Sequence, residues 1–333
     1  MLRYIFALNC LFLFIDAALA WGSDGHKVVG SIADQMLNPS AKQQVAQILS
    51  VDLRTAGPWL DCVKSVERHD DGTFVYKENP RFEPPCTPFK LERSRMEDYA
   101  ARNWFDCSYK TQNVERGCHN TYHFDDVAIQ RDHFDRNFQG TNNHDLVAAI
   151  NAAIAVLLER PASPPFSIKD KKEALFLLAH LVGDLHQPLH VAAVYLDKHG
   201  SLVDPDVTHT IDPTTETTGG NSIFDQSKNF HGEWDANPSG LGDTPTSKLL
   251  DMANAVPLDH GRIENWSVVW ASDTVLAGQE AFAGVTFDKV SDGKWTISFA
   301  DRAAYVRAQE AIKLKQLAKA GARLAEIMNT IWP

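Results

Sequence analysis

The residues with the clearest capacity for chemistry lie in the segment HLVGDLHQPLH, from His180 to His190. His180 and Asp184 are four positions apart, so on an α-helix both side chains point to one face and can share a metal ion. His190 follows His180 by ten positions, which is roughly 80° short of three turns and suits a neighbouring ion. Pro188 has no amide hydrogen, which predicts a kink before His190. Buried charges need pairing or a metal, so the segment predicts metal binding, with a buried helix of hydrogen-bonded histidines as the alternative.

Four further segments contain residues of the same types. His231 and Asp235 in HGEWD repeat the four-residue spacing after a long loop, and alone they are a weaker signal. In WGSDGH, His26 could chelate one ion together with the α-amine and carbonyl of Trp21, if Trp21 begins the mature chain. The remaining candidates are His123 in TYHFDD and Asp61 in PWLDCVK.

The composition is that of a globular protein with an acidic charge balance. The chain of 333 residues is 44% hydrophobic and 23% charged, which excludes a disordered chain, a collagen-like repeat and a polytopic membrane protein. Its 32 Lys and Arg residues against 43 Asp and Glu residues give a net charge of −11. This balance argues against a protein that grips nucleic acid through a basic face. A nucleic-acid substrate is still compatible with it, because bound metal ions can supply a positive field locally.

The first twenty residues, 1–20, have the pattern of a cleaved secretory signal peptide. A positively charged start precedes an almost wholly apolar stretch from Tyr4 to Ile15, and Ala18-Leu-Ala20 supplies the small residues of a cleavage site. The apolar stretch is too short for a typical membrane-spanning helix, and an uncleaved N-terminal anchor is the alternative. Cleavage would leave Trp21 at the start of a single domain, residues 21–333, in a secreted or periplasmic protein.

Four cysteines remain after this cleavage, namely Cys62, Cys86, Cys107 and Cys118. An even number in an exported protein favours disulfide bonds, and four cysteines allow three pairings. We favour the local pairings, Cys62 with Cys86 and Cys107 with Cys118, while the other two arrangements stay open. None of the four has zinc-finger spacing, so we interpret them as structural cross-links.

These segments are embedded in a mainly helical pattern. Apolar residues recur at helical spacing over residues 25–37, and Asn38 followed by Pro39 resembles a helix cap leading into residues 41–49. Further helices are expected at residues 58–68, 145–159, 169–190, 263–282 and 301–331. One small hairpin is expected within residues 286–299.

Two irregular stretches, residues 70–88 and 191–245, interrupt the helical pattern. A connection as long as the second inside a compact domain is usually functional. The expected fold is therefore all-α, a single multi-helix domain with long loops and at most a small β-hairpin.

Taken in combination, the motifs resemble the zinc-dependent single-strand-specific nucleases and 3′-nucleotidases of the P-one and S-one type. The shared pattern is WGxxGH at a signal-peptide cut, then WxD, HF, HxxGDxxQPLH, GGN and HxxWD, and it runs from Trp21 to Asp235. The resemblance implies an all-α scaffold with a trinuclear zinc cleft. It also implies a secreted endonuclease that hydrolyses phosphodiester bonds of single-stranded DNA and RNA, and 3′-nucleotides, to 5′-phosphate products by a zinc-activated hydroxide.

Carried over residue by residue, the resemblance assigns ligands to three Zn²⁺ ions per chain. The first would be held by Asp61, His123, His180 and Asp184. Asp184 would also bridge to the second, which the amine and carbonyl of Trp21 and the side chain of His26 would hold. The third would be held by His190, His231 and Asp235. Nitrogen and oxygen ligands of this kind suit zinc.

The resemblance also assigns residues to the substrate. Lys64 falls where the family has a basic residue that contacts the phosphate, and Asp61 could orient the attacking water, so both are catalytic candidates. Phe124 and Asp126 match a pocket in which an aromatic ring stacks the base and a carboxylate reads its edge. Single-stranded nucleic acid is the implied partner, and no stable protein partner or membrane embedding is implied.

Two departures and two alternatives qualify this assignment. Ala128 stands where members often carry an acid, and Ala236 where some carry Asn, which bears on substrate preference rather than on zinc binding. A zinc-dependent phospholipase C shares the fold, but its Trp-to-His spacing is longer and its last ligand is typically Glu, where this chain has Asp235. A non-catalytic zinc-binding protein would have closed sites, whereas the three-ligand group with His190 and His231 leaves room for substrate.

Overall fold

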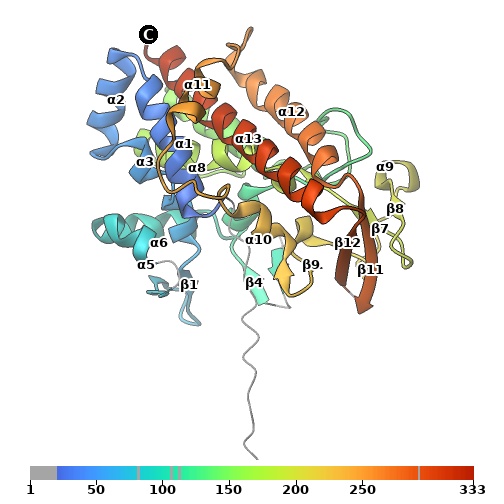
Figure 1. Ribbon diagram of the computed structural model, residues 1–333. Helices are drawn as coiled ribbons and strands as arrows, with labels where there is room; N and C mark the ends of the chain where they lie inside the picture. The colour runs from blue at the N-terminus through green and yellow to red at the C-terminus, as the bar shows by residue number, and fades with distance from the viewer. Residues whose placement is uncertain (1–20, 81–82, 106, 108, 112–113, 292) are drawn as a thin grey trace, which may run out of the picture.

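Helices form most of the molecule, and the longest of them cross around its centre (Figure 1). The computed structural model describes residues 21–80, 83–105, 107, 109–111, 114–291 and 293–333, so the predicted signal peptide lies outside the described residues. The helices are α1 Ser23–Met36, α2 Pro39–Leu49, α3 Leu53–Ala56, α4 Trp59–Val63, α5 Glu83–Cys86, α6 Arg93–Arg102, α7 Leu146–Leu157, α8 Lys171–Leu185, α9 Pro205–Thr208, α10 Phe230–Asp235, α11 Ser247–Asn254, α12 Trp266–Ala281 and α13 Arg302–Ile331. Short 3-10 turns lie at Thr87–Glu92, Cys118–His123, Pro188–His190, Thr218–Gly220 and Ile263–Asn265.

The central helix is α8, in which every side chain from Glu173 to Leu185 is buried. It packs against α7, α13, α1, α3 and α4. Each fully buried leucine or phenylalanine of such a helix contributes roughly 1.5–3 kcal/mol of transfer free energy. The HLVGDL part of the sequence motif therefore lies on the most extensively packed element of the fold.

Side-chain caps fix the starts of three helices predicted from the sequence. Asn38, Asp145 and Asp301 each accept a hydrogen bond from the backbone amide three residues further on. Each bond satisfies an amide that has no partner within the first turn. The predictions of α2, α7 and α13 are confirmed, and α1 likewise agrees with the helix predicted at residues 25–37.

Two predicted helices are shorter than expected. The helix expected at residues 169–190 ends at Leu185, and His190 lies in a separate 3-10 turn. The break follows from Pro188, which has no amide to donate, and from the extended backbone of Gln187 before it. The helix expected at residues 58–68 covers only α4, because the residues that follow it form the first strand of a hairpin.

The expectation of an all-α fold was wrong in detail, since the mostly helical chain also contains several small sheets. The hairpin predicted within residues 286–299 is confirmed as β11 with β12. However, β12 also pairs in parallel with β9, and β10 extends this to four strands. The strands within residues 191–245 are only two or three residues long, too short to show an alternating pattern, and the pairing of β9 with β12 joins segments distant in sequence. The strands are β1 Val66–Arg68, β2 Phe74–Tyr76, β3 Tyr109–Thr111, β4 Val114–Arg116, β5 Val127–Ala128, β6 Ala192–Ala193, β7 Tyr195–Leu196, β8 Leu202–Val203, β9 Ile223–Asp225, β10 Lys228–Asn229, β11 Val285–Ser291 and β12 Lys294–Phe299.

Two disulfide bonds cross-link neighbouring segments. Cys62 is bonded to Cys86, and Cys107 to Cys118, which confirms the local pairings. The first bond ties α4 to α5, next to Asp61. Across the described residues, no helix combines the length and the apolar character that crossing a bilayer requires.

Candidate metal centre

The C-terminal half of α8 and the N-terminal turn of α1 bring the first predicted ligands together. The rings of His26 and His180 stack with centroids 3.7 Å apart, and His26 Nε2 lies 3.4 Å from Asp184 Oδ1. Gly183 makes this approach possible, since a Cβ there would lie 2.9 Å from His26 Nδ1 and 3.8 Å from Trp21 Cδ1. Trp21 is itself fully buried. The structure thus places both ends of the WGSDGH motif beside Asp184.

His180 is the meeting point of the first group. Its Nε2 lies 3.1 Å from His123 Nδ1, 3.3 Å from Asp184 Oδ2 and 3.8 Å from Asp61 Oδ1. Its Nδ1 donates a hydrogen bond of 2.8 Å to the carbonyl of Gly57. Because a carbonyl can only accept, Nδ1 carries the proton and the Nε2 of the neutral ring has a free lone pair. That lone pair faces the other three predicted ligands.

A parallel backbone ladder positions His123 and the residues after it. The amide of Asp125 donates to the carbonyl of His190 at 2.7 Å, and β5 pairs with β6 just beyond. In return, His190 Nδ1 donates to the carbonyl of His123 at 2.6 Å. The ladder therefore aligns the TYHFDD segment with the end of the α8 motif.

A second group forms between the 3-10 turn after α8 and the helix α10. His190 Nε2 lies 3.0 Å from His231 Nε2, and Asp235 Oδ1 lies 3.8 Å and 3.6 Å from these two nitrogens. The amide of Gly22 donates to the carbonyl of Asp235 at 2.8 Å, which ties the Trp21 segment to α10. All nine residues predicted as metal ligands are thus buried, and all of them except Trp21 fall into groups of three whose ligand atoms lie within 4.8 Å of one another.

The protonation states in this second group fit a bound cation. His190 Nδ1 donates to one carbonyl and His231 Nδ1 to another, that of Gly219. The two facing Nε2 atoms therefore both carry lone pairs, which repel each other at 3.0 Å. Burial holds the pKa of His190 well below its usual range and lowers that of His231 to about 4, so a shared proton does not relieve the repulsion at neutral pH.

Carboxylates add uncompensated negative charge to the same volume. Burial raises the pKa of Asp184, and it raises that of Asp235 well above the usual range, to which Asp184 and Asp61 also contribute. Burial lowers the pKa of His180, but Asp184 and Asp61 outweigh burial and the net shift is upward. Among the described residues, no hydrogen-bond partner faces Asp61 Oδ2, Asp184 Oδ1 or Asp235 Oδ2. Facing lone pairs and orphaned carboxylate oxygens of this kind, with nitrogen and oxygen donors, fit zinc ions.

The predicted substrate residues lie at the edge of these groups. Lys64 Nζ donates to Asp61 Oδ1 at 2.8 Å, and the Lys64 side chain is 20% exposed, so its ammonium can also reach solvent. Phe124 is half-buried directly after His123. Burial raises the pKa of Asp126 to about 7, with a further contribution from Glu216. Among the described residues, nothing hydrogen-bonds Asp126 Oδ1, which leaves this oxygen available to a ligand.

Three groups that orient the ligands had no assigned role in the sequence analysis. Gln187 is fully buried, and its Nε2 donates to Asp235 Oδ1 at 2.6 Å while its Oε1 accepts from the amide of Leu189. The carbonyls of Gly57 and Gly219 fix the tautomers of two histidines. Gln187 could have been suspected from its place between two metal-binding residues of one motif, whereas backbone carbonyls leave no signal in a sequence.

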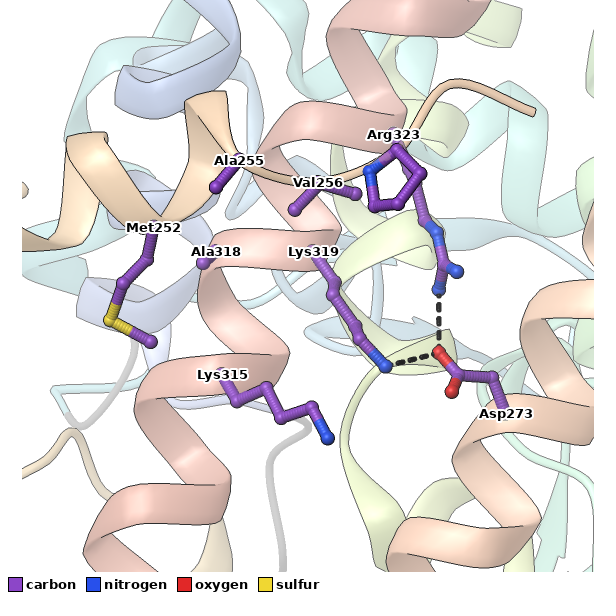
Figure 2. Close-up of a pocket in the computed structure, with 9 residues that line it drawn as sticks. Met252, Ala255, Val256, Asp273, Lys315, Ala318, Lys319 and Arg323 are labelled. Carbon is purple, nitrogen blue, oxygen red and sulfur yellow. Dashed lines mark hydrogen bonds and ion pairs between the residues drawn. The ribbon is translucent and has the colours of Figure 1, made fainter.

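His186, the remaining histidine of the motif, points away from the metal-binding groups. Its Nδ1 donates to the carbonyl of Val182, and its Nε2 accepts from Arg323 Nη1 at 2.9 Å. Arg323 also lines a groove of about 400 Å³ between α11, α12 and α13, where it and Lys319 pair with Asp273 (Figure 2). The hydrogen bonds of His186 therefore serve helix packing.

Comparison with known proteins agrees with the site. The family model described as S1/P1 Nuclease matches residues 21–333. Endonuclease 2 of Arabidopsis thaliana is 22% identical over 334 residues, which cover 94% of this chain and 90% of that protein. Endonuclease 4 of the same plant is 26% identical over 184 residues, covering 53% of this chain and 47% of that protein. The resemblance inferred from the motifs is confirmed, and the chain belongs to the S1/P1 nuclease family.

Proposed function

We propose that this nuclease is a secreted zinc-dependent endonuclease that hydrolyses single-stranded DNA and RNA to 5′-phosphate products, and 3′-nucleotides to nucleosides and phosphate. The observation that carries the proposal is the His190–His231 contact. Two unprotonated nitrogens face each other at 3.0 Å beside a buried carboxylate, an arrangement that calls for a cation. Membership of a nuclease family supports nucleic acid as the substrate class.

Three zinc ions would be held as the resemblance assigns them. Asp61, His123, His180 and Asp184 would hold one, and His190, His231 and Asp235 another. His26, Asp184 and the amine and carbonyl of Trp21 would hold the third. When bound, zinc supplies Lewis-acid activation of water near neutral pH and neutralises charge on the phosphate.

The residues of the chain then have distinct tasks around the phosphodiester. Asp61 Oδ2, buried and without a hydrogen-bond partner among the described residues, orients the attacking water and accepts its proton. Lys64 Nζ lies beside the other oxygen of the same carboxylate and donates to a non-bridging phosphate oxygen. Water attacks phosphorus opposite the 3′ oxygen, the bond from phosphorus to that oxygen breaks, the 3′ oxygen leaves with the bonding electrons and takes a proton from solvent, and the phosphate stays on the 5′ side.

Base recognition supports the preference for single strands. Phe124 would stack on a base, and Asp126 Oδ1 would accept from its edge. A base can stack on a side chain only when it is unstacked and unpaired, and stacking of this kind tolerates every base. Ala128 stands where family members often carry a second acid. Asp126 would therefore be the acid of this segment that accepts a hydrogen bond from the base edge.

The test is a substrate comparison with the zinc-loaded mature protein. Single-stranded DNA, single-stranded RNA and 3′-nucleotides should be hydrolysed, duplex DNA much more slowly, and end-labelling should show 5′-phosphates. Rapid cleavage of phosphatidylcholine with intact nucleic acid would instead favour a phospholipase. Stoichiometric zinc without turnover of any substrate would favour a zinc-binding protein.

Export and the N-terminus belong to the same proposal. Two disulfide bonds are consistent with an oxidising compartment, and we propose that residues 1–20 are a signal peptide whose removal frees the Trp21 amine. An α-amine can bind zinc only when unprotonated, and its reference pKa is about 7.7–8.0. Protein beginning at Trp21 should bind one more zinc than protein beginning with Met-Ala before Trp21. Equal zinc and equal activity would show that the amine is dispensable.

A further inference from the structure

We propose that Arg68, Phe74 and Phe105 form a second subsite, which binds the bases of single-stranded nucleic acid that flank the cleaved bond. The inference rests on the proposed function and adds to it a surface outside the metal centre. Proteins that hold single strands without strong sequence preference combine exposed aromatic rings with cationic groups along the backbone path. Because the chain as a whole is acidic, a surface that combines exposed aromatic rings with a cationic group is a candidate for such binding.

The three side chains form one contiguous patch. Arg68 in β1 stands directly opposite Phe74 in β2. The Arg68 guanidinium lies 5.0 Å from the centroid of the Phe105 ring, and the rings of Phe74 and Phe105 meet edge to face at 6.4 Å. Phe105 is 60% exposed, whereas Trp104 next to it is only 8% exposed. Trp104 therefore belongs to the core, and Phe105 presents its ring to solvent.

Strand alternation turns Glu67, the acid of the described hairpin strands, away from this patch. Successive side chains of a strand point to opposite faces, so Glu67 and Val75 lie on the face opposite to Arg68 and Phe74. Glu67 is paired there with Lys77 at 3.2 Å. Within the part of the chain that the structure describes, Arg68 makes no ion pair, and its charge is available to a phosphate.

The hairpin is a firm support for such a surface. The amide of Lys77 donates to the carbonyl of Ser65 at 2.9 Å, and the amide of Tyr76 donates to Glu97 of α6 at 2.9 Å. Beneath the patch, the Phe74 ring packs against Trp104 at 5.2 Å. A fixed platform loses little entropy when a base stacks on it.

The patch is continuous with the proposed phosphate contact. β1 begins two residues after Lys64, which lies in the turn that ends α4, so Arg68 is on the strand that leads away from that turn. In Figure 1 the β1 hairpin and α10, which carries two of the metal-binding residues, lie along the same lower side of the molecule. A strand whose phosphate contacts Lys64 can therefore continue towards the Phe105 ring.

The experiment compares long and short substrates in the zinc-loaded enzyme. The measured quantity is the ratio of kcat/KM for a twelve-nucleotide single strand to kcat/KM for a dinucleotide. Phe105→Ala should lower this ratio about tenfold, since one stacked base is worth roughly 1–3 kcal/mol. Arg68→Gln should lower it less, and should flatten the slope of log affinity against log salt by about 0.7 for the long strand.

Two matched variants serve as controls. Leu91→Ala removes a side chain that is 97% exposed elsewhere on the surface, and Lys77→Gln removes a cation from the opposite face of the same hairpin. Both should leave the ratio within twofold of the wild type. An unchanged ratio in Phe105→Ala and Arg68→Gln, or an equal loss on both substrates, would overturn the subsite while the endonuclease assignment stands. A wild-type enzyme that cleaves neither substrate would overturn both.

Discussion

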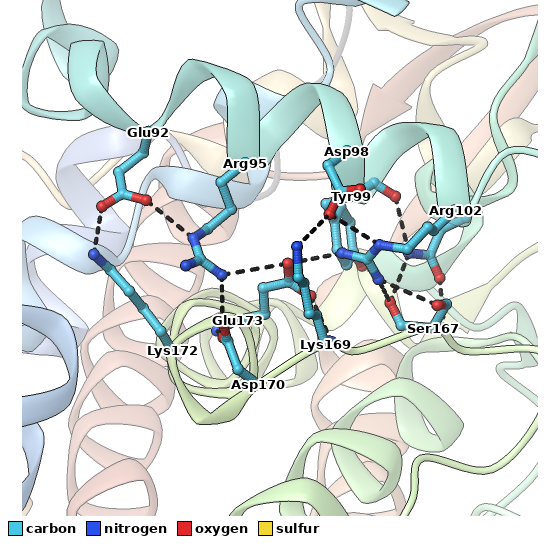
Figure 3. A network of polar contacts seen from close by, with 11 residues as sticks. Glu92, Arg95, Asp98, Tyr99, Arg102, Ser167, Lys169, Asp170, Lys172 and Glu173 are labelled. Atoms are coloured by element: carbon cyan, nitrogen blue, oxygen red, sulfur yellow. Dashed lines mark hydrogen bonds and ion pairs between the residues drawn. The ribbon is translucent and has the colours of Figure 1, made fainter.

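The two ends of α8 carry buried charged residues that are organised in opposite ways. At the N-terminal end, Glu173 is fully buried and accepts hydrogen bonds from Arg102 at 2.7 Å and from the amide of Lys169 at 2.7 Å, with Arg95 at 3.5 Å (Figure 3). At the C-terminal end, Asp184 lies among the three histidines His26, His123 and His180 and near further carboxylates. We call the first group the α6–α8 charge cluster, which comprises Glu92, Arg95, Asp98, Arg102, Lys169, Asp170, Lys172 and Glu173. We call the second group, which comprises the nine residues predicted as metal ligands, the metal centre.

Glu173 and Asp184 are equally buried, and the difference between them lies in the sign and the satisfaction of the charges around them. In the α6–α8 charge cluster every acid has a basic partner from the same set, for example Asp170 with Arg95 and Glu92 with Lys172. In the metal centre, the described residues leave carboxylate oxygens and ring nitrogens without partners. Breaking a buried pair is costly because it leaves an uncompensated charge, whereas buried carboxylate oxygens that have no partner indicate a missing cation. Perturbed carboxylates alone therefore do not mark a functional site.

The largest effect should come from removing metal. Elemental analysis of the mature protein should give about three zinc ions per chain, and chelation should lower the free energy of unfolding by at least about 4 kcal/mol, the value for a ligand at a thousandfold its Kd. Half-molar NaCl should act on the exposed ion pairs and change stability far less. A melting temperature that stays constant after demonstrated zinc loss would contradict this reading of the metal centre.

Neutralising the acid of the paired cluster should have the next largest effect. Burial raises the pKa of Glu173, but the amide of Lys169 and the Arg102 guanidinium oppose it. Glu173→Gln would replace the carboxylate that two guanidinium groups share by a neutral amide, and should cost about 2 kcal/mol. Chemical denaturation measures this change, and zinc content should stay at the wild-type level. A matched change at the exposed pair of Lys171 with Glu159, namely Glu159→Gln, should leave the stability close to that of the wild type.

A smaller effect is expected from the buried amide that orients one ligand. Gln187→Leu removes the donor to Asp235 Oδ1 and should weaken zinc binding by the His190, His231 and Asp235 group about tenfold. Competition with a chelating dye should show one weakened site and two unchanged ones. Gln316→Leu is the control, because Gln316 is equally buried but bonds to Thr274 instead. Uniform weakening of all sites would show that Gln187 supports the fold rather than one group.

Local signals carried the prediction of the long helices, because caps and apolar spacing act over a few residues. Asn38, Asp145 and Asp301 begin helices for this reason. The four-residue spacing of His180 and Asp184 likewise placed two metal-binding residues on one face of α8. The hairpin of β11 and β12 was predicted for the same reason, but its parallel pairing with β9 was not predictable, because that pairing joins segments that lie far apart in the sequence.

The residues of the metal centre likewise divide into those that local spacing predicted and those that only the folded chain brings together. Spacing alone pointed to His180, Asp184 and His190, whereas Asp61 and His123 were named on their resemblance to a family. Their approach depends on the β5–β6 ladder and on contacts across the core. Gln187 lay inside a quoted motif without a role, because its function requires Asp235, which is close only in the folded chain.

The last prediction concerns Asp184→Asn, which replaces a carboxylate by an amide as Glu173→Gln does, but which should not lower the stability of the metal-free protein. Burial raises the pKa of Asp184 in the metal-free fold, so the folded chain holds its ionised form less favourably than the unfolded chain does. That penalty is present at pH 7 and fades as the pH falls through the folded pKa, where the carboxyl becomes neutral. Chelated Asp184→Asn should therefore melt no lower than chelated wild type at pH 7, and any gain in melting temperature should shrink as the pH falls.

Loaded with zinc, the same variant should lose more metal than Asp61→Asn, because Asp184 is assigned to two ions. If Asp184→Asn lowered the stability of the chelated protein as much as Glu173→Gln lowers that of the wild type, the two ends of α8 would not differ in how their buried acids are held.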